Sequence, residues 1–371
     1  MKQLVITLLI LFIGLSPTSA NAYDQKTFVV DGIAYRTISN SSIQVIPHPD
    51  KKYEGEITIP HTVIYNTSKY NVTQIGSRAF YDCDKLTKLT LPGTITDIEE
   101  YAFTKCTALE EIMLPESITR TSYGIFDDCY NLRKVILSSK MTIISGCSFV
   151  NCTKLKEIII PYGVREVLMS AFSTCESLEK LEFPASVTEI HPSVAHYCTN
   201  LRSITFGLGK NSEMTPVDSR LKLSGIAPQF SHCPNIENVY SLYVNPPQIG
   251  TGTPSPTAEP IENPVFDDIT FENATLHVPV GSLDAYHNSS MWGKFKDIRE
   301  TDFAALDTIE EDEDTFIING LTLNFSHPSI SATAYDIAGR KIANTVNGTL
   351  TFPTRGIYIV KTRTTSHKIA L

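Results

Sequence analysis

Cysteine is the residue in this 371-residue chain whose type and spacing most suggest chemistry. A thiolate can act as a nucleophile, bind a metal ion or form a disulfide, so a regular set of cysteines raises all three possibilities. Cys147 alone stands outside the regular set. The others lie 23 residues apart, with a last interval of 35 that equals 23 plus a 12-residue insertion: Cys83, Cys106, Cys129, Cys152, Cys175, Cys198 and Cys233.

A regular column of cysteines fits none of the three chemistries well. In parallel strands about 4.8 Å apart, the Cα–Cβ bonds are parallel, which leaves Cβ atoms too far apart for the spacing of about 3.8 Å that a disulfide prefers. Single ligands stacked in a line do not form the tetrahedron of a metal site. His232 precedes Cys233, but that cysteine is on the regular spacing and is expected to face the core. The sequence therefore predicts buried, reduced cysteines that pack as small apolar side chains.

Other catalytic motifs are incomplete. Ser177-x-x-Lys180 and Ser219-x-x-Lys222 match the first element of the serine β-lactamases, but the S-D-N and K-T-G elements are absent. The chain contains neither H-E-x-x-H nor G-x-S-x-G. We predict a protein that is not an enzyme and uses no cofactor, with no metal-binding residues.

A repeated pattern, A/x-F-x-x-C-x-x-L-x-x-L/I-x-L-P, must position the cysteines. In the first full unit it predicts a short helical turn through Phe80 and Cys83, then a strand in which Leu89 and Leu91 face the core. Proline ends each strand because it lacks the N–H that a central strand needs. A 23-residue period is typical of leucine-rich repeats, whose units are stable only when they stack.

The units resemble BspA-like leucine-rich repeats, which occur on surface and secreted proteins of host-associated bacteria. The family's entry pattern is similar to residues 55–80, and its exit to residues 272–298, where Tyr286, Trp292 and Phe295 are expected to cover the last coil. The resemblance implies an α/β fold: a curved solenoid with a parallel β-sheet on the concave side and short helical turns and strands elsewhere. It also implies surface attachment or ligand binding, without catalysis or a cofactor.

The strand register predicts which side chains face outward on the concave side. Residues one position before each core leucine point away from the core. The first outward position alternates in charge, which predicts cross-strand ion pairs that favour this register. Its residues are Lys88, Glu111, Lys134, Glu157 and Lys180.

The second outward position carries an apolar stripe, Met113, Ile136 and Ile159, followed by Glu182. Exposed apolar patches often mark partner contacts, so these four residues are the candidate ligand-binding set. The alternative is that β-branched residues suit a strand wherever they fall.

The N-terminal end of the chain has the features of an export signal. An apolar run at 4–15 and the sequence Ala20-Asn21-Ala22 are typical of a signal peptide cleaved after Ala22, and the run is too short to span a bilayer. We predict a chain secreted or held on the outer cell surface, with no transmembrane segment in its mature form.

Residues 335–342 ("YDIAGRKI") and 355–362 ("RGIYIVKT") resemble the C-terminal sorting domains read by type IX secretion. This resemblance implies contact with export machinery; an immunoglobulin-like module without a sorting role is the alternative. Thr308, in Asp307-Thr308-Ile309, matches a bacterial O-glycosylation sequon.

The net charge of -9 argues against nucleic acid as a partner. The predicted partner is an extracellular protein or glycan, for example one of the host matrix, bound in adhesion or host interaction. The alternative is a structural spacer or matrix component without a specific ligand.

The expected domains are a signal peptide at 1–22, an N-terminal β-rich cap at 23–56, repeats at 57–244, a Pro-rich loop at 245–264, a C-terminal repeat cap at 265–302, an acidic linker at 303–315 and a small all-β sandwich at 316–371.

Overall fold

The computed structural model describes most of the repeat region and part of the C-terminal module. The described residues are 25–210, 215–217, 221–224, 227–250, 264–303, 316–319, 322–325, 331–336, 341–345, 348–352, 357–361 and 366–370. The predicted signal peptide, most of the Pro-rich loop and nearly all of the acidic linker lie outside them.

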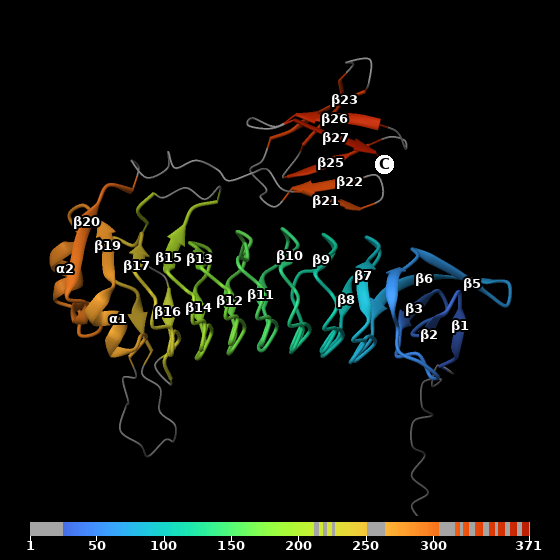
Figure 1. Cartoon of the computed structure of the whole chain (residues 1–371), viewed down its shortest axis with the longest axis horizontal. Helices are drawn as coiled ribbons and strands as arrows, with labels where there is room; N and C mark the ends of the chain where they lie inside the picture. The colour runs from blue at the N-terminus through green and yellow to red at the C-terminus, as the bar shows by residue number, and fades with distance from the viewer. Residues whose placement is uncertain are drawn as a thin grey trace, which may run out of the picture.

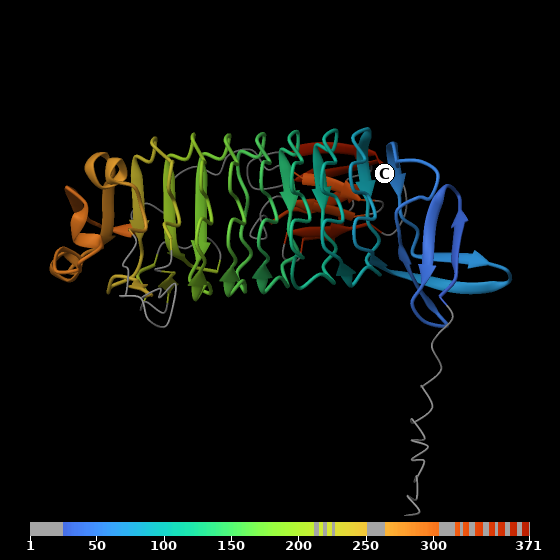
Figure 2. The same cartoon turned by 90° about the horizontal axis from the view of Figure 1, so that it is seen from below.

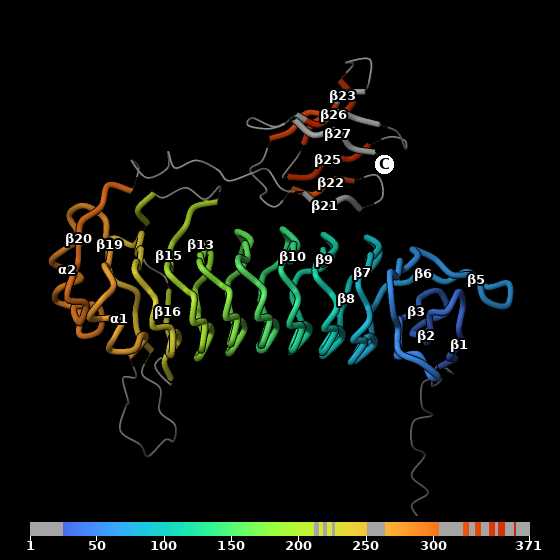
Figure 3. The backbone as a smooth tube through the Cα atoms, in the orientation of Figure 1, coloured from blue at the N-terminus to red at the C-terminus, as the bar shows by residue number. Residues whose placement is uncertain are grey.

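The repeats form a leucine-rich-repeat fold in which coil follows coil at regular spacing (Figures 1 and 3). In both cartoon views the coils lie in an almost straight row, so the curvature that the resemblance implies is slight (Figures 1 and 2). None of the helices in the described part of the chain has the length and apolar character that a membrane crossing needs.

One side of the solenoid, here called the strand face, carries the longer parallel strands. They form three hydrogen-bonded groups. These are β4 (Gly55–Thr58) with β7 (Leu86–Thr90); β9 (Glu111–Met113) with β10 (Lys134–Ile136); and β13 (Lys180–Pro184), β15 (Ser203–Leu208), β17 (Asn238–Ser241), β19 (Thr275–Pro279) and β20 (Asp297–Thr301).

A second ladder consists of two-residue strands that come after the longer strands in the chain. It is also parallel, in the order β11 (Ile143–Ile144), β12 (Glu166–Val167), β14 (Glu189–Ile190), β16 (Lys222–Leu223) and β18 (Gln248–Ile249).

The N-terminal end is covered by a six-stranded sheet. Its members are β1 (Thr27–Val30), β2 (Ile33–Thr37), β3 (Ser42–Val45), β6 (Ser68–Ile75), β5 (Thr62–Tyr65) and, paired with β6, β8 (Asp97–Ile98).

The C-terminal end is covered by α1 (Asp268–Asn273), α2 (Leu283–His287) and the 3-10 helix η1 (Trp292–Lys294). Tyr286, Trp292 and Phe295 are buried in the solenoid core, which confirms the prediction for these three side chains. The Trp292 indole N–H donates to the Pro247 carbonyl at 3.0 Å.

The predicted helical turn at each Phe-x-x-Cys segment is wrong, since no helix is assigned between residues 25 and 210, a stretch described without a gap. The residue before each periodic cysteine is left-handed, with φ between 58° and 62°, and a left-handed residue cannot continue a right-handed helix. Each segment is therefore an isolated turn; in the first, the Cys83 N–H donates to the Phe80 carbonyl at 3.2 Å. Neighbouring coils are joined here as well, because the Phe80 N–H donates to the Ala102 carbonyl at 2.8 Å.

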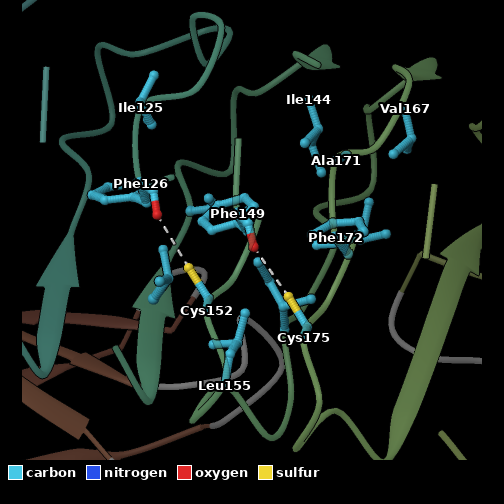
Figure 4. Close-up of a cluster of buried hydrophobic side chains, with 14 of the residues drawn as sticks. Ile125, Phe126, Ile144, Phe149, Cys152, Leu155, Val167, Ala171, Phe172 and Cys175 are labelled. Atoms are coloured by element: carbon cyan, nitrogen blue, oxygen red, sulfur yellow. Dashed lines mark hydrogen bonds between the residues drawn. The ribbon is translucent and has the colours of Figure 1, made fainter. Parts of the chain in front are cut away.

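The periodic cysteines are buried free thiols, as predicted, but they do more than fill space. From Cys106 to Cys198, each Sγ donates to the carbonyl of the phenylalanine in the preceding coil at 3.1–3.3 Å. Figure 4 shows two of these bonds, from Cys152 to Phe126 and from Cys175 to Phe149. The phenylalanine rings form a parallel column, with centroids 5.5 Å apart between Phe149 and Phe172. The cysteine column thus links each coil to the one before it.

The C-terminal module consists of two antiparallel sheets. One contains β21 (Phe316–Asn319), β22 (Thr322–Phe325) and β25 (Thr349–Thr351), and the other contains β24 (Lys341–Asn344), β23 (Thr333–Asp336), β26 (Ile357–Lys361) and β27 (Ser366–Ala370). Leu323 and Leu350 of the first sheet share a core with Ala334 and Val360 of the second.

Candidate functional site: the strand face

The strand register agrees with the predicted neighbours along β9 and β10. Glu111 lies beside Lys134, and Met113 lies beside Ile136. Glu182 is likewise the register partner of Thr205. The buried and partly exposed residues alternate along β9 and β10, so the stripe does point away from the core.

The predicted chain of cross-strand ion pairs is wrong in its partners. Within residues 25–210, no two of the five alternating charges form a contact within 4.0 Å with each other. Lys88 instead pairs with Glu56 of β4, at 3.8 Å. Glu111 pairs with Arg133, at 3.0 Å, and Arg133 also reaches Glu110, at 3.1 Å.

Two other members of the series have different surroundings. Lys180 pairs within its own strand, with Glu182 at 2.9 Å. Lys134 is half buried, and this burial lowers the pKa of its ammonium, while the charges of Glu111 and Glu157 act in the opposite direction.

The hydrogen-bonded ladder of the strand face is interrupted between β7 and β9 and again after β10. β7 and β9 follow each other in the stack, yet they belong to separate sheets. Residues 157–160, which follow β10 in the stack, are not assigned as a strand. A cleft lies at each interruption.

The first cleft, between β7 and β9, has a volume of about 420 Å³. Its apolar lining includes Leu89, Leu91, Ile112 and Met113. Charged side chains of both signs also line it: Glu56, Lys88, Glu110, Glu111 and Arg133. Both basic groups are already paired with carboxylates, so the lining keeps one carboxylate in excess.

The second cleft lies between β10 and residues 159–161 and is much smaller, with a volume of about 50 Å³. Ile136 and Ile159 line it from the solenoid, and Phe325 and Thr349 line it from the C-terminal module. The stripe is therefore divided, because Met113 lines the first cleft while the two isoleucines line the second. Glu182 lines neither of these two clefts.

The remaining candidates are Ala22, Thr308 and the cysteines. Ala22 and Thr308 lie outside the described residues. Burial raises the pKa of Cys106 and Cys152 well above the ordinary value, so these thiols are poor nucleophiles. In the part of the chain that the structure describes, no three His, Cys, Asp or Glu side chains are placed to hold a metal ion.

Sequence reasoning missed a polar cluster that forms across the 12-residue insertion. The Ser231 hydroxyl lies 2.7 Å from His196 Nδ1, and the His196 and His232 rings contact each other at an angle of 40°, with centroids 4.8 Å apart. Tyr197 contacts both imidazoles. The sequence did contain a signal for this cluster, because Tyr197 and His232 each stand directly before a periodic cysteine and so occupy equivalent positions in successive coils. Ser231 is buried and Asp267 accepts the backbone N–H of His232, so the cluster has a packing role.

Comparison with known proteins found a similarity for part of the repeat region. Residues 122–215 match the family model for the BspA type leucine-rich repeat region, in six copies. This match covers about a quarter of the chain. No curated protein matches the sequence.

Several solved structures are similar to the chain. The leucine-rich repeat protein of T. pallidum, TpLRR, is 19% identical, and the match covers 62% of this chain and 85% of that one, with a TM-score of 0.38. A leucine-rich repeat protein from Bacteroides ovatus is 22% identical, covering 68% and 78%, with a TM-score of 0.30. A leucine rich cell surface protein from Faecalibacterium prausnitzii is 16% identical, covering 78% and 99%, with a TM-score of 0.26.

Proposed function

We propose that the protein is a non-enzymatic leucine-rich-repeat protein, secreted or held on the outer cell surface, that binds an extracellular protein or glycan through the first cleft. The observation that carries this proposal is the open cleft of about 420 Å³ on the strand face. Clefts of roughly 300–1,000 Å³ with an apolar lining and a few polar groups are the usual form of ligand sites.

Met113 is the residue of the candidate stripe that lies in this cleft. A methionine side chain is unbranched and polarisable, so it adapts to partners of different shape. The paired charges around it are partly exposed and are suited to orienting a ligand rather than to supplying most of its affinity. A role in adhesion or host interaction rests on this site and on the BspA-type repeats.

Export and processing complete the proposal. The N-terminal sequence supports a signal peptide cleaved after Ala22. The two antiparallel sheets of the C-terminal module are consistent with a β-sandwich that acts as a sorting domain for export machinery. Intact-mass measurement of protein secreted by the native host tests cleavage after Ala22 and glycosylation of Thr308 together.

The binding test uses the full chain and two methionine variants. Met113→Asp places a charge in the first cleft, whereas Met169→Asp changes a methionine that is 52% exposed and lines neither cleft. Each protein is titrated by biolayer interferometry against extracellular-matrix proteins, mucins and bacterial glycans. We expect saturable binding that Met113→Asp weakens at least tenfold and Met169→Asp leaves unchanged.

Two other outcomes would point to a different binding site or a different function. Binding that both variants retain places the site elsewhere, with the loops near Gly207 and the Pro-rich segment as the next candidates. The absence of binding across the panel favours the alternative of a structural spacer or matrix component.

A further inference from the structure

We propose that the strand face around Ile136 and Ile159 is a docking surface for the chain's own C-terminal module. The two parts of the molecule line the second cleft together. The module lies alongside the coils of β9 and β10 in both cartoon views (Figures 1 and 2). A ligand that uses these two isoleucines must therefore displace the module first.

The chemistry of the two surfaces is complementary. The solenoid presents Ile136, Ile159 and Pro161, which are apolar and would otherwise face water. The module presents the end of β22 and the start of β25, with Phe325 and Thr349, and none of its residues at the cleft is charged. Covering apolar side chains with a neutral surface removes them from water without burying an unpaired charge.

The closeness of the two surfaces supports docking. Residues of both parts line one small cleft of about 50 Å³, so the module and the solenoid lie close together there. The first cleft, which the module does not line, is about 420 Å³. Ile159 nevertheless stays 36% exposed, so the contact is incomplete and is expected to be weak.

A carboxylate marks the solenoid side of the docking surface. Glu116 lines the second cleft and accepts hydrogen bonds from Ser139, at 3.2 Å from the backbone N–H and 2.5 Å from the hydroxyl. On the module side, the Thr349 hydroxyl donates to Asn324 Oδ1 at 3.2 Å. Glu116 and Thr349 line the same cleft, so a negative charge introduced at position 349 is expected to repel the Glu116 carboxylate and weaken the contact.

Because the two parts are joined in one chain by a short segment, a weak contact is sufficient to keep the module docked. The sequence between Phe303 and Phe316 provides 13 peptide steps, which reach at most about 45 Å when fully extended. Short linkers hold two surfaces at effective concentrations in the millimolar range. A docked module therefore competes with any ligand present at micromolar concentration, and leaves Met113 as the freely reachable part of the stripe.

Hydrogen exchange of the full chain, followed by mass spectrometry, tests this docking without any ligand. Ile159→Asp places a charge in the second cleft, and Met113→Asp is the matched control on the same stripe. We expect Ile159→Asp to accelerate exchange in Thr322–Phe325 about tenfold and Met113→Asp to leave it unchanged. Equal exchange of this strand in both variants and the wild type would overturn the proposal.

A second variant distinguishes loss of docking from local damage to the solenoid. Thr349→Asp changes only the module, so faster exchange in Lys134–Ile136 can arise only through the shared contact. Exchange at the Phe149–Cys152 turn is the internal control for an intact coil. If Thr349→Asp leaves Lys134–Ile136 unchanged, the module does not dock there, whatever the binding assays on the first cleft show.

Discussion

Replacing one periodic cysteine tests the role that the structure gives to the whole column. Cys175 is fully buried, and its Sγ donates to the Phe149 carbonyl at 3.1 Å. That carbonyl also accepts the Cys152 N–H at 3.3 Å, so it keeps one partner when the thiol is removed. Cys175→Ala therefore removes one buried atom and one hydrogen bond, and leaves a small cavity.

The magnitude follows from these three losses. Removing an atom of methylene size loses about 0.8 kcal/mol of burial. A residual cavity of about 25 Å³ adds about 0.6 kcal/mol, and the net value of one hydrogen bond is about 0.5–1 kcal/mol. We expect Cys175→Ala to lower the free energy of unfolding by about 2 kcal/mol.

Urea unfolding followed by circular dichroism measures this change against two reference variants. Cys175→Ser restores a donor and should lose less than Cys175→Ala. Cys147→Ser should change stability by less than about 0.5 kcal/mol, because Cys147 is only partly buried and lies outside the column. If Cys175→Ala matches Cys147→Ser, the column does not stabilise the stack. If Cys175→Ser is as damaging as Cys175→Ala, the hydrogen bond to the preceding coil is not part of its role.

Three further predictions concern titration and the C-terminal end. Burial raises the pKa of Asp127 to about 6, so the folded state binds more protons than the unfolded state between pH 4 and 6. The free energy of unfolding should therefore fall as pH rises through this range, by on the order of 1 kcal/mol for a half-exposed carboxyl. Asp127→Asn should abolish this pH dependence in unfolding experiments. Burial, and then the charge of His232, lower the pKa of His196, so His232→Asn should move that pKa upward in an NMR titration, and an unmoved pKa would show that the imidazoles are independent. Trp292→Ala should destabilise the chain by about 3–5 kcal/mol in thermal unfolding because it removes the largest buried side chain from the last coil, and a loss below 1 kcal/mol would contradict its covering role.

The sequence predicted the repeating features because they are local and recur. The 23-residue period places every Phe-x-x-Cys segment above the previous one, so the buried cysteines and the strand register at Met113 and Ile136 follow from spacing. The cover by Trp292 was predicted instead from the resemblance of residues 272–298 to the exit pattern of the repeat family. The turn conformation was harder to foresee. The left-handed position before each periodic cysteine is occupied by Asp, Asn or His in some coils and by Lys, Thr or Tyr in others. Only the first three types favour this conformation, so the residue types give no common signal.

Only the tertiary structure decided how the strand face is divided. The strand register places Glu111 beside Lys134, yet Glu111 pairs with Arg133. The arginine precedes Lys134 in the chain, and its long side chain reaches the Glu111 carboxylate. The contact of Phe325 with the cleft at Ile159 joins residues far apart in the chain, and no periodic pattern relates them. A repeat determines what is the same in every coil, whereas the site depends on where neighbouring coils differ and on which distant segment packs against them.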